Sequence, residues 1–306
     1  MIQITERDKG FLKIVNETGV CNSKLPLTIY PTRYCRSRLE LMERAKIINR
    51  KYGLIMIGLE GKIYLESIGV VPKLVDTLST LSQKRLARTL EFKDLLPTMK
   101  VISSAQYKRE NNLNRGMQFV TAATTKSGAS YLIYDVPKKL NVEARTQILH
   151  ELKNKNNVIN TAIIFTRNRG FAELLSTSNV YISELLVLPP NVDSFRLLNK
   201  MAEGDFSKKV LTAAFPKLKG EPILNKKQTQ YIVGNDYYLN LVLNNISIYD
   251  TLSSFDILAI QSGITSSSVY NIVCLNVDKE FFQNSIDQLN LKKLNVQLIG
   301  IEESSF

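Results

Sequence analysis

Residues 30–53 read YPTRYCRSRLELMERAKIINRKYG, which places seven cationic side chains ahead of a glycine. Three of them, Arg33, Arg36 and Arg38, fall within six residues. The apolar spacing that follows the proline predicts a helix over residues 32–45. This helix is either a solvated surface element or one that contacts a polyanion, and the surrounding sequence has to decide between the two.

A helical wheel separates the stretch into two faces. Cys35, Leu39 and Met42 define an apolar face. Arg38 lies about 60° from the centre of that face, so we expect it at the edge of the core, supporting the helix. The opposite face carries Arg33, Ser37, Glu40 and Arg44, with Arg36 on its flank. The basic run therefore divides into a packing face and an exposed face.

The exposed face has the chemistry of a DNA-reading helix. Arginine in the N-terminal half of such a helix can bond guanine edges bidentately or hold phosphate, and serine can do either weakly. Glu40 and Glu43 favour the alternative, a solvated face whose charge they neutralise. The predicted DNA contacts are Thr32, Arg33, Arg36, Ser37, Arg44, Lys51 and Lys62.

Two helices are predicted ahead of the basic one. Thr5 and Asp8 have the spacing of a capping box, which predicts a helix over residues 5–17. A second, short helix is predicted over residues 23–30. The basic helix would then be the third of the chain.

A β-hairpin is predicted after the basic helix. Residues 54–58 and 62–67 have strand composition and are separated by a glycine-containing turn. Lys51 precedes this hairpin and Lys62 falls in its turn, where a wing would contact phosphates. Three helices followed by a hairpin predict a winged helix-turn-helix over residues 1–70.

The remainder is predicted to be α/β. Leucines at near-helical intervals predict a connecting helix within residues 71–99. Two copies of the chain could form a homodimer through this helix. Strands that alternate with helices predict an α/β domain over 100–205 and a second over 206–306, joined by a linker at 204–227. Strands are expected at 100–108, 116–124, 130–137, 159–166, 181–189, 230–234, 237–243, 255–260, 269–277 and 295–302, and helices at 142–155, 169–176, 191–202 and 279–291.

Charge is unevenly distributed along the chain. Its 306 residues carry a formal net charge of +12. Lys and Arg against Asp and Glu number 18 and 10 in residues 1–100, 13 and 7 in 101–200, and 9 and 11 in 201–306. A concentrated positive field attracts polyanions, of which nucleic acid and anionic membrane are the usual candidates. The mild acidity of the last third indicates a surface that contacts protein.

Cysteine usage and hydropathy bear on the cellular location of the protein. Cys21, Cys35 and Cys274 are too far apart for a paired metal spacing, and their odd number argues against a disulfide framework. No run approaches the roughly 20 apolar residues of a membrane span. We therefore expect a cytoplasmic protein with no membrane partner, no cofactor and no bound metal.

No catalytic constellation is recognisable. The single histidine, His150, lies on a predicted helix without an orienting partner, and no phosphate-binding P-loop is present. Residues 91–93 and 151–153 match half of a nuclease E-x-K signature, but both fall on predicted helices. Two-metal hydrolysis needs acids that converge at a strand end, where only Asp135 stands. We predict a protein that is not an enzyme, with a metal-dependent nuclease or nickase in the middle domain as the alternative.

Three segments carry a family resemblance. ITERDKGFLKIV (4–15), YCRSRLELMERAKIINR (34–50) and GKIYLESIG (61–69) resemble the opening of the replication-relaxation family of Gram-positive plasmids, phages and integrative elements. The resemblance spans about residues 3–69 and implies DNA binding in replication, DNA relaxation or transfer of a mobile element. Some relatives carry a nuclease-like α/β domain behind the winged helix, which would correspond to a degenerate domain at residues 100–205.

The sequence thus predicts a double-stranded DNA-binding protein of a mobile element. Its further partners would be a second copy of the chain and other replication or transfer proteins. A transcriptional regulator whose C-terminal region senses a ligand or peptide is the remaining alternative.

Overall fold

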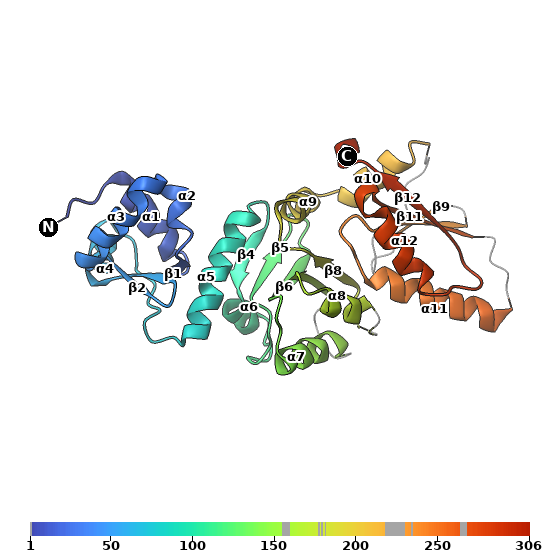
Figure 1. Cartoon of the computed structure of the whole chain (residues 1–306), viewed down its shortest axis with the longest axis horizontal. Helices are drawn as coiled ribbons and strands as arrows, with labels where there is room; N and C mark the ends of the chain where they lie inside the picture. The colour runs from blue at the N-terminus through green and yellow to red at the C-terminus, as the bar shows by residue number, and fades with distance from the viewer. Residues whose placement is uncertain are drawn as a thin grey trace. The chain divides into compact units, whose positions relative to one another are not determined.

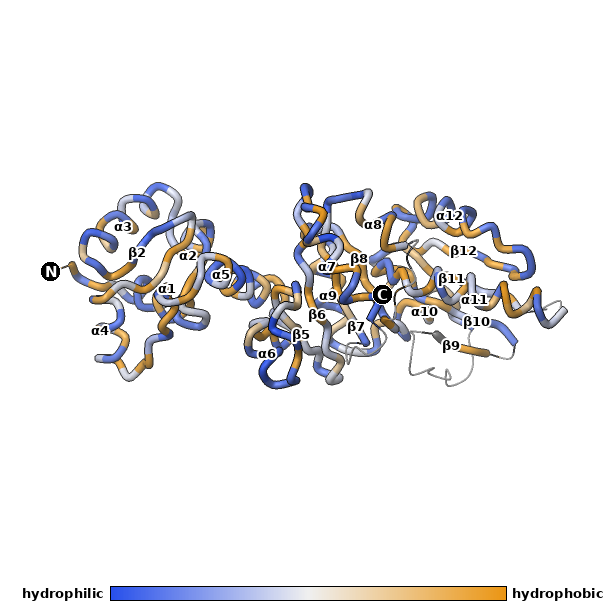
Figure 2. Tube along the Cα trace, turned by 90° about the horizontal axis from the view of Figure 1, so that it is seen from below, coloured by the Kyte–Doolittle hydropathy of each residue, from blue (hydrophilic) through white to orange (hydrophobic). Residues whose placement is uncertain are grey.

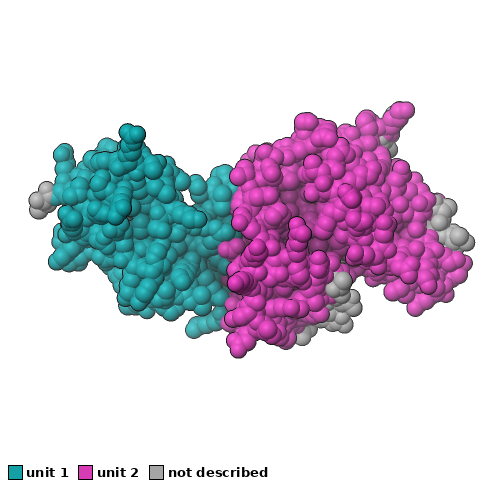
Figure 3. Space-filling model, in the orientation of Figure 1, with its two compact units in different colours: residues 1–115, 120–122 teal, residues 116–119, 123–306 magenta. Residues whose placement is uncertain are grey.

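The protein is described here by a computed structural model, which is of the mixed α/β class. It covers residues 2–154, 160–176, 178, 180, 182–217, 230–233, 235–263 and 268–306. The chain divides into two compact units, each of which is continuous except at their boundary (Figure 3). The first unit is Met1–Arg115 with Val120–Ala122, and the second is Gly116–Phe119 with Ala123–Phe306. The boundaries predicted near residues 70, 99 and 205 lie inside these units.

The first unit opens with three helices and three short strands (Figure 1). In chain order they are α1 (Glu6–Asn16), β1 (Val20–Asn22), α2 (Pro26–Ile29), α3 (Thr32–Arg44), β2 (Ile48–Lys51) and β3 (Leu54–Ile57). All three predicted helices are confirmed, although α2 is shorter than expected. The capping box of α1 is also confirmed, since Thr5 Oγ1 accepts from the Asp8 amide at 3.3 Å and Asp8 Oδ2 accepts from the Thr5 amide at 2.7 Å.

The three strands form one antiparallel sheet of order β1-β3-β2. β2 and β3 are joined by a two-residue turn, Tyr52 and Gly53, whose φ angles are 54° and 75°. Positive φ at both central residues is the geometry of a type I′ turn, whose twist matches that of paired strands. This hairpin places Lys51 and Tyr52 at its tip.

The predicted hairpin was wrong in position. The expected first strand, residues 54–58, is the second strand β3, whereas residues 62–67 belong to a helix, α4 (Leu59–Ser67). Gly61, the glycine of the predicted turn, lies inside α4, and Gly58 at the start of α4 lies against the backbone of the segment between α3 and β2. A Cβ at Gly58 would collide with the Lys46 carbonyl oxygen, so glycine permits α4 to start close to that segment.

An apolar cluster joins α1, α3 and α4 to the sheet. Figure 2 shows hydrophobic positions recurring along α1 and α3, among hydrophilic ones. The buried cluster includes Phe11, Leu12 and Val15 of α1, Cys35, Leu39 and Met42 of α3, Ile48, Ile55 and Ile57 of the hairpin, and Leu65 of α4. The apolar face predicted for the basic helix is therefore confirmed.

The connecting helix, α5 (Thr80–Leu95), begins later than predicted. Ser79 caps its N-terminus. The residues ahead of Ser79 are held outside the helix because the Asn16 side chain donates to the Val71 carbonyl at 2.9 Å and accepts from the Lys73 amide at 2.8 Å. These two hydrogen bonds tie the segment to the end of α1.

Two elements of the predicted middle domain are also corrected. The expected strand 100–108 is a strand only in β4 (Lys100–Ser103), and it continues as helix α6 (Ser104–Glu110). Ser103 explains the change, because its hydroxyl accepts from the Gln106 amide at 3.3 Å and caps α6. The expected strand 116–124 is confined to β5 (Thr121–Thr124).

Strands and helices alternate in the second unit. Its elements are β6 (Ser130–Val136), α7 (Val142–Lys153), β7 (Thr161–Thr166), α8 (Arg169–Ser176), β8 (Glu184–Leu188), α9 (Val192–Ala202), α10 (Phe206–Ala214), β9 (Gln230–Val233), β10 (Asp236–Asn240), α11 (Ser247–Ser262), β11 (Val269–Leu275), η1 (Asn276–Asp278), α12 (Lys279–Asp287), β12 (Asn295–Ile301) and η2 (Glu303–Ser305). In its first sheet, β6, β7 and β8 pair side by side in that order and are parallel. The four-stranded sheet has the order β12-β11-β10-β9, in which only β9 is antiparallel to its neighbour.

Two predictions for this unit were wrong. Residues 255–260, expected as a strand, lie within α11. The predicted linker at 204–227 contains α10, which buries Phe206, Val210 and Leu211 at helical spacing. The part of that linker at 218–227 lies outside the described residues. Among the helices that are described, none is both long and apolar enough to cross a lipid bilayer.

Candidate functional site

The exposed face of α3 gathers most of the predicted contact residues. Thr32, Arg33, Arg36, Ser37 and Arg44 are all exposed, while Cys35, Leu39 and Met42 are buried beneath them. The separation of these two sets follows from the helical repeat, since positions 33, 37, 40 and 44 recur on one side. The helix thus presents a cationic, hydroxyl-bearing surface.

The cations of this surface differ in how far they are neutralised. Arg36 Nε lies 3.1 Å from Glu40 Oε1, but the Arg36 side chain is 89% exposed. An ion pair that is so exposed is weak, because water and salt screen it. In the described part of the chain, Arg33 and Arg44 enter no ion pair. Glu40 therefore offsets the charge of Arg36 only partly, and no acidic residue of the described chain offsets the charges of Arg33 and Arg44. This argues against the alternative of a neutralised, solvated face.

Arg38 behaves differently from its neighbours. Its Nε donates to Asp8 Oδ1 at 3.0 Å, and its Nη2 donates to the Gln3 carbonyl at 2.7 Å and to Asp8 Oδ2. Tyr30 donates its hydroxyl to the same carboxylate at 2.9 Å. Burial opposes the charge on Asp8, yet the hydrogen bonds from Arg38, Thr5 and Tyr30 hold its pKa below the usual value. Arg38 therefore packs α3 onto α1 and is not part of the exposed face.

The hairpin adds a second group of cations beside α3. Lys51 lies at the end of β2, with its Nζ 4.9 Å from the centre of the Tyr52 ring. Arg50 Nε donates to Glu43 Oε2 at 2.8 Å, which ties β2 to the last turns of α3. This hydrogen bond from Arg50 lowers the pKa of Glu43. Glu43 is therefore used to position the hairpin.

Lys62 is not at a hairpin turn. It lies on α4 and forms an ion pair with Asp76, both residues being in the first unit. The prediction that Lys62 stands in a wing was wrong because the hairpin is formed one strand earlier. Residues 61–69, which resemble the hairpin of the replication-relaxation family, form most of α4 and the two residues after it.

Sequence reasoning missed two hairpin residues, Arg50 and Tyr52. Tyr52 is 66% exposed at the tip of the hairpin, and it adopts a positive φ that a bulky residue seldom takes. The signal available in the sequence was the glycine at position 53, directly ahead of the apolar run LIMI. That glycine, together with Tyr52, is the turn.

The residues considered for catalysis remain scattered. The two E-x-K matches lie on α5 and α7, as predicted. Glu151 accepts the Gln118 amide at 2.8 Å and the Tyr134 hydroxyl at 2.9 Å, and Lys93 pairs with Glu17 at 2.9 Å. Among the described residues, no three His, Cys, Asp or Glu side chains converge in a way that could hold a metal ion. Glu151 and Lys93 thus have structural partners.

Comparison of the chain with protein-family models, with curated proteins and with solved structures found no match.

Proposed function

We propose that residues 6–57 form a winged helix-turn-helix that binds double-stranded DNA. The element order α1-β1-α2-α3-β2-β3, with the three strands in one antiparallel sheet, supports this assignment. The observation that carries the proposal is the exposed face of α3. There, Arg33, Arg36 and Arg44 stay on the surface while the intervening Arg38 is used in the core.

In this proposal α3 is the recognition helix and enters the major groove. Recognition helices contact base edges mainly through their N-terminal residues, which here are Thr32, Arg33, Arg36 and Ser37. No side chain caps the N-terminus of α3, so its first amides are available to a phosphate oxygen. Arg44 lies further along the same face and contacts the backbone.

The β2–β3 hairpin is the wing and contacts the phosphate backbone. Lys51 supplies the charge, and Tyr52 beside it offers a hydroxyl and an aromatic ring at the tip. The hydrogen bond between Arg50 and Glu43 holds the wing next to α3, so that both elements can engage one stretch of duplex. The buried pair of Arg38 and Asp8 keeps α3 in place on α1.

The biological setting we propose is the replication, relaxation or transfer of a mobile genetic element, as the resemblance of the N-terminal segments implies. The second unit would then hold copies of the protein together or recruit other replication or transfer proteins. Sequencing the fragments of host plasmid that the purified protein retains tests this setting. Enrichment of an origin supports it, whereas enrichment of promoters would favour a transcriptional regulator.

DNA binding is tested by fluorescence anisotropy with a labelled duplex at low salt. The variant with both Arg33→Ala and Arg36→Ala should bind at least about tenfold more weakly, because each arginine contact to a base edge contributes about 1–3 kcal/mol. The matched control is Lys208→Ala with Lys209→Ala, which removes two exposed charges from α10 in the second unit. Absence of duplex binding, or equal affinity of the two variants, would refute the assignment of α3.

A further inference from the structure

The second unit contains a cleft of about 830 Å³, a volume within the roughly 300–1,000 Å³ of sites that bind small molecules. The last residues of four strands line it, namely Thr166 of β7, Leu188 of β8, Leu275 of β11 and Ile301 of β12. β7 and β8 are parallel, as are β11 and β12, so each of the two sheets directs carboxyl ends of strands at the cleft. In open α/β sheets, ligands bind outside the carboxyl ends of the strands. The position of the cleft is therefore that of a ligand site.

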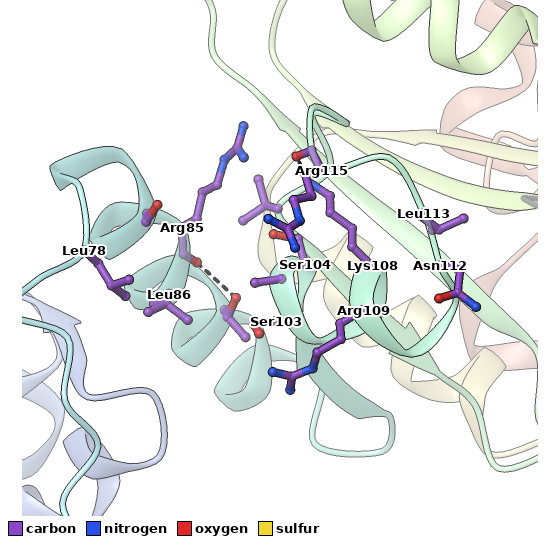
Figure 4. Close-up of a pocket in the computed structure, with 14 residues that line it drawn as sticks. Leu78, Arg85, Leu86, Ser103, Ser104, Lys108, Arg109, Asn112, Leu113 and Arg115 are labelled. Atoms are coloured by element: carbon purple, nitrogen blue, oxygen red, sulfur yellow. Dashed lines mark hydrogen bonds between the residues drawn. The ribbon is translucent and has the colours of Figure 1, made fainter.

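The first unit has a hollow of its own, of about 650 Å³, between α5 and α6 (Figure 4). Arg85, Lys108 and Arg115 line it. The Lys108 ammonium donates to the Arg115 carbonyl at 3.1 Å, and the Arg85 carbonyl accepts from the Thr89 hydroxyl at 3.0 Å. Polar groups of this hollow thus have partners within the protein, and the cleft of the second unit is the stronger ligand site.

A seam between the two sheets lines the cleft. The Val187 amide donates to the Asn244 carbonyl at 3.2 Å, and the Ile246 amide donates to the Leu185 carbonyl at 2.9 Å. The Asn244 side chain donates its Nδ2 to the Val187 carbonyl at 2.8 Å. Because a carbonyl only accepts, this bond fixes the orientation of the amide, and its Oδ1 is left buried with no donor among the described residues. A hydrogen-bond donor on a ligand would satisfy this oxygen.

One group of charges in the cleft is already neutralised. Arg196 Nε donates to Glu303 Oε1 at 2.8 Å, and Arg196 Nη2 donates to Glu303 Oε2 at 2.6 Å and to Asp193 Oδ1 at 2.9 Å. Lys200 Nζ lies 3.4 Å from Glu303 Oε1. The hydrogen bond from Arg196 lowers the pKa of Glu303. These charges satisfy one another, so other residues of the cleft have to supply the contacts to a charged ligand.

The wall that follows β7 is cationic. Arg167 and Arg169 line the cleft at the start of α8, and both side chains are exposed. Neither enters an ion pair in the part of the chain that the structure describes, although Arg167 Nη2 donates to the Pro190 carbonyl at 3.4 Å. The N-terminal end of α8 adds a partial positive charge. This wall favours an anionic group, and guanidinium matches a carboxylate bidentately.

The wall that follows β11 and β12 is anionic. Asp278 of η1 and Glu302, directly after β12, both line the cleft. Within the described ranges neither forms an ion pair, and Glu302 Oε1 accepts from Asn276 Nδ2 at 2.6 Å. Asp278 is partly buried, and burial raises the pKa of its carboxyl because it opposes the charged form. A cationic group at this wall would offset that cost.

Apolar side chains lie beside the anionic wall. Val277 directly precedes Asp278, and Phe281 follows it by three residues; both line the cleft and are 85% and 60% exposed. An aromatic ring attracts an organic cation through its face and also supplies apolar surface. Among the described residues, no three His, Cys, Asp or Glu side chains converge in a way that could hold a metal ion. This wall therefore suits an organic ammonium group better than a metal ion.

We propose that the cleft binds a zwitterion that carries a carboxylate and an ammonium group, either a free amino acid or a short peptide. Its carboxylate pairs with Arg167 and Arg169, and its ammonium pairs with Asp278 and Glu302. The charges of these four side chains sum to zero, as do those of the ligand, whose apolar part contacts Phe281. This proposal is independent of DNA binding by the first unit.

Binding is tested on the full chain by measuring Tm with each of the twenty amino acids and each of the twenty tripeptides Ala-X-Ala at millimolar concentration. At least one of these ligands should raise the Tm, because it binds the folded state. Titration calorimetry then ranks their affinities. Tighter binding of an amino acid than of any tripeptide identifies the ligand as a free amino acid, and the reverse identifies it as a peptide. No rise in Tm with any of them would overturn the proposal.

Blocked forms of the best ligand test its two charges separately. The C-terminal amide lacks the carboxylate, and the N-acetyl form lacks the ammonium. Each should bind at least about tenfold more weakly than the unblocked ligand, because hydrogen bonds between charged groups are the strong ones. A blocked form that binds as tightly as the unblocked ligand would overturn the proposal.

Arg169→Ala and Asp278→Asn remove one charge from each wall. The Arg169 side chain is exposed and the Asp278 side chain makes no capping hydrogen bond at α12, so both variants should fold, which circular dichroism checks. Arg169→Ala should weaken the unblocked ligand at least about fivefold and leave the C-terminal amide unchanged. Asp278→Asn should do the same for the unblocked ligand and leave the N-acetyl form unchanged.

The matched control is Lys208→Ala with Lys209→Ala, which removes two exposed charges of the same unit outside the cleft. It should keep the affinity for the unblocked ligand within about twofold. Equal losses of affinity in the control and in the two cleft variants would refute the proposal. A loss in Arg169→Ala that is the same for the amide and the unblocked ligand would refute the pairing of the carboxylate with the cationic wall.

Discussion

Arg38 and Asp8 form an ion pair inside the core of the first unit, with side chains that are only 7% and 1% exposed. Arg38 comes from α3 and Asp8 from α1. Tyr30, the residue directly after α2, also donates its hydroxyl to the Asp8 carboxylate. One carboxylate therefore ties together three consecutive helical segments. This arrangement explains why one arginine of the basic run is withdrawn from the surface.

Replacement of Arg38 should be strongly destabilising. Arg38→Ala leaves the Asp8 carboxylate buried without its main partner, and breaking a buried pair in this way costs about 3–5 kcal/mol. Arg33→Ala, an exposed neighbour on the same helix, should change stability by about 0.5 kcal/mol or less. Urea unfolding, followed by hydrogen exchange of α1 and α3 amides, measures both. Equal effects of the two substitutions would contradict the buried-pair account.

The Asp8 site should also make the first unit acid-sensitive. Because the pKa of Asp8 in the folded state lies below its ordinary value of 3.8, its contribution is present above that pH and is lost as the pH falls through the folded-state pKa. Tm measured from neutral pH downward should thus fall more steeply below pH 3.8 for the wild type than for Asp8→Asn. Parallel curves below that pH would show that Asp8 does not titrate with a lowered pKa.

The glycines around the hairpin should respond differently to alanine. The methyl group of Gly53→Ala would contact no neighbouring atom. The substitution should lower the free energy of unfolding by about 1 kcal/mol, the strain of a positive φ. Gly58→Ala directs a methyl group at the Lys46 carbonyl and should cost more, about 3 kcal/mol. Thermal unfolding measures both. If Gly53→Ala were the more damaging, the packing of α4 against the segment before β2 would be incorrect.

Salt dependence of DNA binding should separate Lys51 from Lys62. Each phosphate contact contributes about 0.9 to the slope of log affinity against log salt. Lys51→Ala should lower the slope by about that amount, because Lys51 stands at the tip of the wing. Lys62→Ala should leave it unchanged, since Lys62 lies on α4 paired with Asp76. A reduced slope in Lys62→Ala would show that Lys62 contacts phosphate from α4 and would contradict this assignment.

Asp256 should be essential to the four-stranded sheet region of the second unit. Its carboxylate accepts the amides of Lys292, Lys293 and Leu294 at 3.0, 2.7 and 3.1 Å, directly ahead of β12. These hydrogen bonds hold its pKa down against the effect of burial. Asp256→Ala should destabilise the unit by about 1–3 kcal/mol, because it removes the acceptor of three amides and each hydrogen bond contributes about 0.5–1.5 kcal/mol net.

Asp256→Asn is the matched variant, since it keeps one acceptor oxygen and should be milder. Hydrogen exchange at residues 292–294 reads out the effect directly. Rapid exchange there is expected for Asp256→Ala only. Protection that survives in both variants would mean that other groups hold this segment.

Where side chains interact with near neighbours along the chain, the sequence was enough to predict the structure. The capping box of Thr5 and Asp8 joins residues three apart, and the apolar face of α3 repeats with the helical period. The alternation of buried strands and helices from β6 to α9 was likewise evident. Leu74 and Leu78 show the limit, because their spacing suggested a helix that begins earlier, yet both lie ahead of α5 and are exposed.

Other features depend on which distant segments meet. Gly58 marks a close approach to the chain ahead of β2, and Arg38 finds Asp8 thirty residues away along the chain. Arg85 and Arg115 converge on one hollow from separate elements. The sequence alone determined that the run at residues 30–53 has a packing face and a cationic face. The same helical period singled out Arg38 as the arginine at the edge of the core, and the structure buries it. Only tertiary packing decided that Arg38 pairs with Asp8 and which hairpin lies beside α3, because both depend on contacts that no local period encodes.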